Sequence, residues 1–153
     1  MRLWRIAARR FAGPDGRGAE LYGGRWSSPG RPLIYAASTL SLAMLELLAR
    51  LPTGEIPRDY VALAIEVPDD TMVEEIAPGD LPGWDAADQV ASRAFGGAWL
   101  AAARSALLLV PAPAVPQERN ALLDPHHLEF ARVAVLPPAV LAWDRRLFAR
   151  RET

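Results

Sequence analysis

Cysteine is absent from this sequence of 153 residues, and histidine occurs only twice. Without cysteine the chain forms neither a disulfide nor a thiolate metal site, and two histidines do not supply a zinc ligand set. We therefore expect no metal. Lysine is also absent, so arginine accounts for all 17 basic residues. A genome rich in G and C explains most of this bias, although single arginines can still serve the bidentate recognition of an anion.

A strong charge of either sign and a long hydrophobic run are also lacking. The formal net charge of −1 argues against direct binding of nucleic acid through a broad basic surface. No hydrophobic run reaches membrane-spanning length, and the N-terminal residues lack the apolar core of a signal peptide. Because 51% of the residues are hydrophobic, the chain can bury the core of one domain. We expect a single cytoplasmic domain over residues 1–153.

Strand and helix signals alternate along the chain, which predicts the α+β class. Strands are expected at 3–7, 32–36, 61–67, 107–110, 133–136 and 140–143. A helix is expected from a cap at Ser38 or Thr39 to about Arg50, and another over 85–104, split by Gly96 and Gly97. Residues 13–18 are expected to form a turn-rich loop.

Glu46 is the single acidic residue of the first of these helices, in which most other side chains are apolar. A helix that is apolar nearly all round is buried, and a buried carboxylate without a partner is unfavourable. Glu46 is therefore expected to have a nearby hydrogen-bond donor or to face a cleft. The structural alternatives are a buried salt bridge, with Arg25 for example, and a frayed, exposed turn.

The segment Gly23-Gly24-Arg25-Trp26 joins two glycines to a cation and a large aromatic ring. Glycines allow a sharp turn or a close approach to a ligand, and Trp26 can anchor the segment in the core. An arginine held in this way suits bidentate contact with a phosphate or a carboxylate. A surface arginine on a turn is the alternative. Tyr35, in the following strand, is either a core aromatic or a ring that stacks on a ligand.

Three prolines follow the strand predicted at 107–110, so residues 111–116 are expected to form a stiff loop that can line a pocket. The two histidines lie further on, at positions 126 and 127. For His127 we expect a capping or loop role, with a general base as the alternative.

Taken together, these segments resemble the RES domain family over nearly the whole chain, from Leu3 to about Phe148. The resemblance rests on the order of five motifs: Gly23–Trp26, Tyr35–Ser38, Ala43–Glu46, Trp99–Leu100 and Val110–His127. It implies a single-domain fold similar to that of the ADP-ribosyltransferase toxins, with small mixed or antiparallel sheets around a cleft and flanking helices.

RES proteins are toxins of bacterial type II toxin–antitoxin modules, and their partner is an antitoxin with an Xre-type helix-turn-helix. Family members deplete NAD by hydrolysis or phosphorolysis, or they transfer ADP-ribose to a protein. The resemblance thus implies NAD as the substrate, an antitoxin as the partner and no metal. Assembly into a homo-oligomer within the toxin–antitoxin complex stays open.

The resemblance also assigns roles to individual residues. Arg25 would bind an NAD phosphate, and Tyr35 would pack against the nicotinamide or its ribose. Glu46 would hydrogen-bond the ribose hydroxyls and stabilise the oxocarbenium-like state that forms when the nicotinamide bond breaks. Trp26 and Asn120 complete the implied NAD-binding set.

Three positions depart from the family pattern. Ala112 stands where the family has its serine, Asp124 where it has an asparagine, and Ser27 where an asparagine is usual. Alanine has no side-chain donor or acceptor. Asp124 would repel the NAD phosphates if it faced the pocket. Ser105 precedes the strand and is not expected to replace the missing serine.

These departures leave several explanations for Ala112. The chain is a natural variant with altered activity, or a disarmed toxin, or Asn120 or Arg119 takes over the role of the serine. The corresponding alternatives to NAD cleavage are a module that binds NAD or the antitoxin without turnover, and an ADP-ribosyltransferase that acts on a protein.

Overall fold

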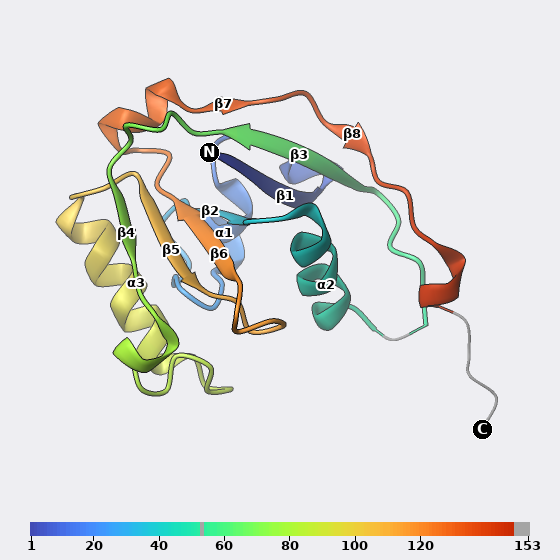
Figure 1. Ribbon diagram of the computed structural model, residues 1–153, viewed down its shortest axis with the longest axis horizontal. Helices are drawn as coiled ribbons and strands as arrows, with labels where there is room; N and C mark the ends of the chain where they lie inside the picture. The colour runs from blue at the N-terminus through green and yellow to red at the C-terminus, as the bar shows by residue number, and fades with distance from the viewer. Residues whose placement is uncertain (53, 149–153) are drawn as a thin grey trace.

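The computed structural model describes residues 1–52 and 54–148 (Figure 1). Its strands are β1 (Arg2–Ala8), β2 (Ile34–Ala37), β3 (Tyr60–Glu66), β4 (Val73–Glu75), β5 (Leu107–Pro111), β6 (Arg119–Leu123), β7 (Ala134–Val135) and β8 (Ala139–Val140). Its α-helices are α1 (Arg17–Tyr22), α2 (Leu40–Arg50) and α3 (Val90–Ala102). Short 3-10 helices lie at Arg9–Phe11, Pro78–Asp80, Leu128–Arg132 and Arg145–Leu147.

The strands of the described residues form one eight-stranded sheet in the order β4-β5-β6-β2-β1-β3-β7, with β8 also paired to β3. Strands β4 and β5 are parallel, and the other pairs are antiparallel. The longest ladder joins β1 to β3, from Arg2 opposite Glu66 to Ala8 opposite Tyr60. The predicted α+β class is confirmed, and the strands join in a single mixed sheet.

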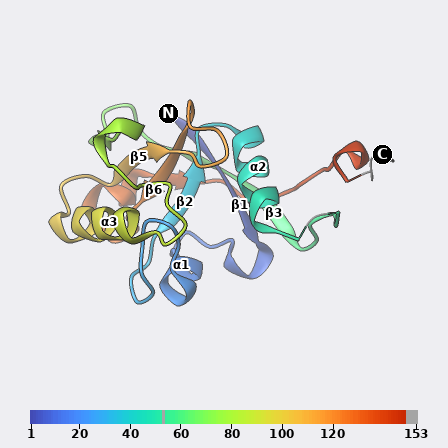
Figure 2. The same ribbon diagram turned by 90° about the horizontal axis from the view of Figure 1, so that it is seen from below.

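Apolar side chains cover both faces of the sheet, because successive residues of a strand point to opposite sides. One face carries the core around α3: Trp26, Leu33, Trp99, Leu100, Leu108, Val110 and Leu122. The other face carries Leu3, Ile34, Ile65, Val67, Leu107, Ala121 and Leu123. Helix α3 packs through Trp99 and Leu100 against the first of these faces. Helix α2 lies further along the same face, where Leu42 and Ala43 pack with Ala37. Figures 1 and 2 show α3 beside β5 and α2 beside β1.

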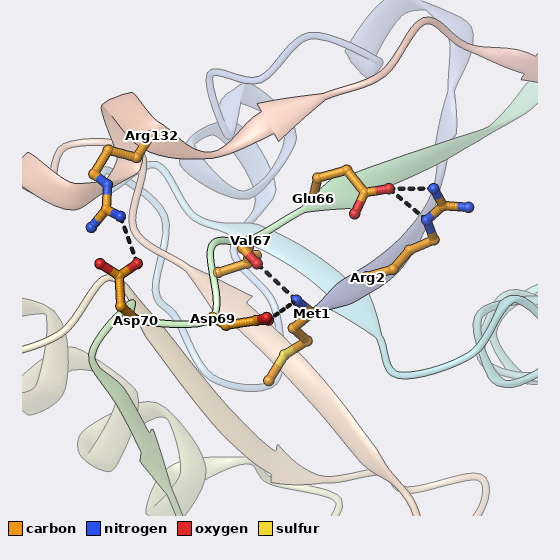
Figure 3. Close-up of polar contacts among 7 residues, drawn as sticks. All are labelled: Met1, Arg2, Glu66, Val67, Asp69, Asp70 and Arg132. Atoms are coloured by element: carbon orange, nitrogen blue, oxygen red, sulfur yellow. Dashed lines mark hydrogen bonds and ion pairs between the residues drawn. The ribbon is translucent and has the colours of Figure 1, made fainter.

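Polar contacts hold the N-terminus against the end of β3 (Figure 3). The Met1 amine donates to the Val67 carbonyl and to the Asp69 carboxylate, at 2.8 Å in each case. Figure 3 also shows the ion pairs Arg2 with Glu66 and Arg132 with Asp70. Exposed ion pairs add little stability, so the backbone ladder between β1 and β3 sets the register.

The structure corrects the prediction that two glycines split the second helix. Helix α3 is continuous from Val90 to Ala102. Gly96 is buried where the helix crosses the backbone of Trp26, and a Cβ atom at this position would overlap the Trp26 carbonyl. Gly97, by contrast, has open space around it. The first glycine allows close packing and does not break the helix.

One α-helix and two strands have no counterpart in the sequence-based prediction. Helix α1 begins inside the segment for which only a turn-rich loop was expected, and it ends at Tyr22 with its C-cap at Gly23, whose φ of 68° suits glycine. Strand β4 is three residues long. Strand β6 pairs with both β2 and β5 and so completes the centre of the sheet. Pro111, expected to follow β5, is its last residue.

Among the described residues, no helix is both long enough and apolar enough to cross a membrane.

Candidate active site

Helix α2 places Glu46 on its sheet-facing side. The Thr39 side chain accepts a hydrogen bond from the Leu42 backbone at 3.1 Å, which confirms one of the two predicted caps. Leu42 and Ala43 are buried, and Glu46 lies one turn further along the same face. Leu45 is 47% exposed, however. The composition of the helix had suggested burial on all sides, but the structure shows one side exposed. Glu46 is half-buried beside that exposed side.

The Glu46 carboxylate is held by two donors. Oε1 accepts from Asn120 Nδ2 at 3.0 Å and from the Ala114 backbone N–H at 3.2 Å. Ala114 lies in the proline-rich loop after β5, so this loop reaches the acid. The salt bridge to Arg25 is not formed, and the described residues donate no hydrogen bond to Oε2. One carboxylate oxygen is fixed, and the other can accept from a ligand.

The guanidinium of Arg25 lies against the segment that precedes α3. Its Nη1 donates to the carbonyls of Trp84, at 3.2 Å, and Ala86, at 3.0 Å. The Ser92 hydroxyl, from α3, donates to the Arg25 carbonyl at 2.7 Å. Arg25 is thus fixed from both its backbone and its side chain. The other guanidinium nitrogens make no hydrogen bond within the described residues and can bind an anion.

The side chain of Trp26 is only 2% exposed and packs edge-on against Phe95. This burial agrees with the predicted anchoring role, but it corrects the inclusion of Trp26 among residues that contact NAD. Its contribution is to hold Arg25 and Tyr35 in place.

Tyr35 projects from β2 on the face that carries Trp26. Its hydroxyl accepts from the Trp26 backbone N–H at 3.0 Å and shares a hydrogen bond of 2.9 Å with Ser27 Oγ. A Cβ atom on Gly24 would lie 2.6 Å from the Tyr35 ring. The second glycine of the motif thus makes room for the tyrosine, where the sequence had suggested room for a ligand. Burial raises the pKa of Tyr35, and its hydrogen bonds act in the opposite direction.

Tyr35→Phe is expected to lower the free energy of unfolding by about 1–2 kcal/mol at neutral pH, because it leaves the buried Trp26 N–H without an acceptor. The pKa of Tyr35 is raised above its ordinary value of 10.0, so the folded chain holds this proton more tightly than the unfolded chain does. The stabilisation is therefore full below pH 10 and is lost as the pH rises above it.

Denaturant titrations of both proteins at pH 7 and pH 11 measure this effect. The difference in unfolding free energy between the wild type and Tyr35→Phe should narrow at the higher pH. Other tyrosines titrate in both proteins and cancel in the difference. A difference that widens would contradict the assigned environment.

Two arginines that the sequence reasoning missed lie near Tyr35. The charges of Arg93 and Arg50 both act on its hydroxyl in the direction that lowers the pKa of Tyr35. Arg93, from α3, donates through Nε to the Gly24 carbonyl at 3.1 Å. Arg50 is four residues after Glu46 and shares its helix face, a spacing that the sequence already contained. For Arg93 no local signal existed, because only the fold brings α3 to Gly24.

Ala112 is completely buried in a cluster with Ala37, Leu42 and Ala43 beneath α2. Its methyl group has no access to a ligand. Asn120 lies beside it in the sheet and contacts Glu46 directly. Of the two residues suggested as replacements for the serine, Asn120 is therefore in place. Arg119 pairs with Glu75 and donates to two loop carbonyls.

The remaining candidates have structural roles. Asp124 is 2% exposed, accepts from the His126 N–H at 2.9 Å and lies 3.7 Å from Arg31. His127 Nδ1 accepts from the Glu129 N–H, and Nε2 lies 3.1 Å from the Ala103 carbonyl. This arrangement matches the expected capping role. Ser105 is buried between Trp99 and Glu74.

Two shallow surface hollows lie away from these residues. One, of about 580 Å³, is lined by Leu51, Pro52, Gly54, Glu55, Ile56, Pro57, Arg58 and Tyr60. The other, of about 420 Å³, is lined by Ala8, Arg9, Arg10 and Asp59. Neither is lined by a predicted site residue. Within the described residues, acidic and histidine side chains form no group that could hold a metal ion.

Comparison with known proteins decides the family. The model of the RES domain matches residues 2–144. The chain belongs to the RES domain family. A RES relative from Sphingobium sp. strain YBL2, named Prs ADP-ribosylating toxin, is 45% identical over 82% of this chain and 83% of its own length. Another, named Toxin Res, from Yersinia enterocolitica, is 38% identical over 96% of this chain and 99% of its own length.

A solved structure supports the fold of this RES domain. The crystal structure of the M. tuberculosis MbcT–MbcA toxin–antitoxin complex contains a chain that superposes with a TM-score of 0.76. The match covers 92% of the present chain and 83% of that chain at 19% identity. At this identity the likeness concerns the arrangement of helices and strands.

Proposed function

We propose that this RES domain is the toxin of a bacterial toxin–antitoxin module and cleaves the bond between nicotinamide and ribose in NAD. The observation that carries the proposal is the Glu46 carboxylate, which two donors fix through Oε1 while Oε2 accepts none from the described residues. The names of the relatives from Sphingobium and Yersinia support the toxin assignment.

The fixed carboxylate suits the charge that develops in the reaction. As the nicotinamide departs with the electrons of its bond to ribose, positive charge grows at the anomeric carbon and its ring oxygen. Glu46 Oε2 would accept a hydrogen bond from a ribose hydroxyl and stabilise this charge. Because its position is set before the substrate binds, the carboxylate needs no reorganisation during the reaction.

The neighbouring residues would bind the rest of the substrate. Tyr35 is on the same sheet face as Asn120, which holds Glu46, and the two are diagonal neighbours across β2 and β6. The half-buried Tyr35 ring would pack against the nicotinamide or its ribose. Arg25 would bind a phosphate, and Arg93 and Arg50 add positive charge near the same ring.

A second candidate is the transfer of ADP-ribose to a protein. The specific support is the name of the 45% identical relative, an ADP-ribosylating toxin. The two reactions break the same bond and differ only in the nucleophile that attacks the anomeric carbon: water or phosphate in one case, a protein side chain in the other.

The test is to incubate the purified chain with NAD and to measure nicotinamide release, with Glu46→Ala as the control. We expect release above the control, and analysis of the second product identifies the acceptor. Free ADP-ribose indicates hydrolysis, a phosphorylated ADP-ribose in phosphate buffer indicates phosphorolysis, and label on a lysate protein indicates transfer. Equal rates for both proteins would contradict NAD cleavage, and tight NAD binding without release would indicate a module without turnover.

The proposed partner is an antitoxin of the Xre helix-turn-helix type. A complex of toxin and antitoxin provides the solved structure with the same fold. The partner, and not the toxin itself, would bind nucleic acid, which agrees with the net charge of −1.

A further inference from the structure

Asn120 occupies a central position in the sheet, between two neighbouring strands. It lies opposite Ala37 of β2 and Val110 of β5, and its side chain donates to Glu46 from beneath α2. An ionised carboxylate only accepts hydrogen bonds, so the amide must point its nitrogen toward Glu46. The amide oxygen then faces the other way.

The amide oxygen of Asn120 has no hydrogen-bond partner among the described residues. Oδ1 is buried, and none of these residues donates to it. A buried acceptor without a donor is unfavourable, so native structures seldom contain one without a reason. The amide that positions Glu46 is therefore held firmly at one end only.

Position 112 is a neighbour of Asn120 from which a side chain could donate to this oxygen. The Ala112 N–H donates to the Glu118 carbonyl at 3.3 Å, which extends the ladder of β5 and β6 by one position. Because Ala112 is two residues after Val110, it points to the same face as Asn120 and is its diagonal neighbour. Its side chain is 0% exposed. A hydroxyl at this position would be a donor on the same buried face as Oδ1, shielded from solvent.

We infer that Asn120 is the residue that positions Glu46, and that position 112 acts on the site only through Asn120, by supplying or withholding a donor to its amide oxygen. The assignment of catalysis to Glu46 rests on the proposed function, but the coupling between positions 112 and 120 does not. On this view, a serine at position 112, as in the family pattern, supports Glu46 through the Asn120 amide and does not contact NAD.

A double-mutant cycle on thermal stability tests the coupling without any enzyme assay. Ala112→Ser is expected to raise Tm by about 2–4 °C, the shift typical of one net hydrogen bond in a chain of this size. The same change in an Asn120→Leu background, which keeps the number and branching of the side-chain heavy atoms but removes the acceptor, should lower Tm. Ala112→Cys serves as the control of similar size, with only a weak donor. Equal shifts in both backgrounds would overturn the coupling.

Kinetics then tests the positioning role. Asn120→Leu is expected to lower kcat for nicotinamide release about 10²-fold, with KM changed less than about threefold, because the acid is misplaced while the binding groups remain. Ala112→Ser should raise kcat by about fivefold, the rate equivalent of one net hydrogen bond. In the Asn120→Leu background this gain should disappear.

A Glu46→Gln background separates positioning from general damage to the fold. If Asn120 acts through Glu46, then Asn120→Leu should cause little further loss of kcat once the carboxylate is gone. A full 10²-fold further loss would overturn the positioning role. If no protein, including the wild type, releases nicotinamide, the proposed function fails, and the stability cycle still decides whether positions 112 and 120 are coupled.

Discussion

Replacing Glu46 with glutamine is expected to lower the rate of nicotinamide release from NAD by about 10²–10³-fold. The glutamine side chain has the same shape, and its oxygen can still accept from the Ala114 N–H, so α2 keeps its place on the sheet. What the variant loses is the negative charge beside the anomeric carbon. The effect should therefore appear mainly in kcat, because the charge is needed most in the transition state.

The matched control is Glu66→Gln, which removes an acid that pairs with Arg2 of β1. Glu66 is on β3, which two strands, β2 and β1, separate from β6 in the sheet. It should leave the rate within about twofold of the wild type, since exposed ion pairs contribute little. Growth of cells that express each variant offers an independent measurement. If Glu46→Gln cleaved NAD and inhibited growth as the wild type does, Glu46 would have no catalytic part.

The second large effect is expected from two adjacent glycines of α3. Gly96→Ala should lower the free energy of unfolding by more than about 3 kcal/mol, because the new methyl group would overlap the Trp26 carbonyl, a backbone atom that cannot move aside alone. Gly97→Ala meets no atom within 4 Å and should raise stability by about 0.5–1 kcal/mol.

Denaturant unfolding of the two variants measures this contrast within one helix. Gly96→Ala should also weaken NAD binding, because Ser92 of the same helix donates to the Arg25 carbonyl and would move with it. Similar stabilities for both variants would mean that α3 and Trp26 are less closely packed than the structure shows.

The prediction agrees best with the structure where an element depends on interactions between residues that are close in the sequence. Thr39 and the apolar run after it specify α2 locally, because a cap and a helical pattern need only neighbouring residues. The alternation of Val61, Leu63 and Ile65 likewise specified β3. By contrast, residues 13–18 are rich in turn formers, which hid the short helix α1.

Glu46 illustrates what local reasoning cannot reach. Its unusual place in an apolar helix predicted a donor nearby, and the structure supplies two. The donors lie 68 and 74 residues further along the chain, on a loop and a strand that only the sheet order brings to α2. The helix pattern predicted that Glu46 has a hydrogen-bond donor but not which residue supplies it, and Arg25, given as an example, is not that donor.

The sequence by itself determined the α+β class, the helix and strand that carry Glu46 and Tyr35, and the order of motifs that marks a RES domain. Caps, alternation and motif spacing are properties of neighbouring residues, so they can be read directly. Tertiary structure decided that Trp26 is core, that Gly24 and Gly96 serve packing, and that Asn120 holds Glu46 above the buried Ala112. These outcomes depend on contacts between distant segments, because the pairing of β5, β6 and β2 sets which side chains share one face.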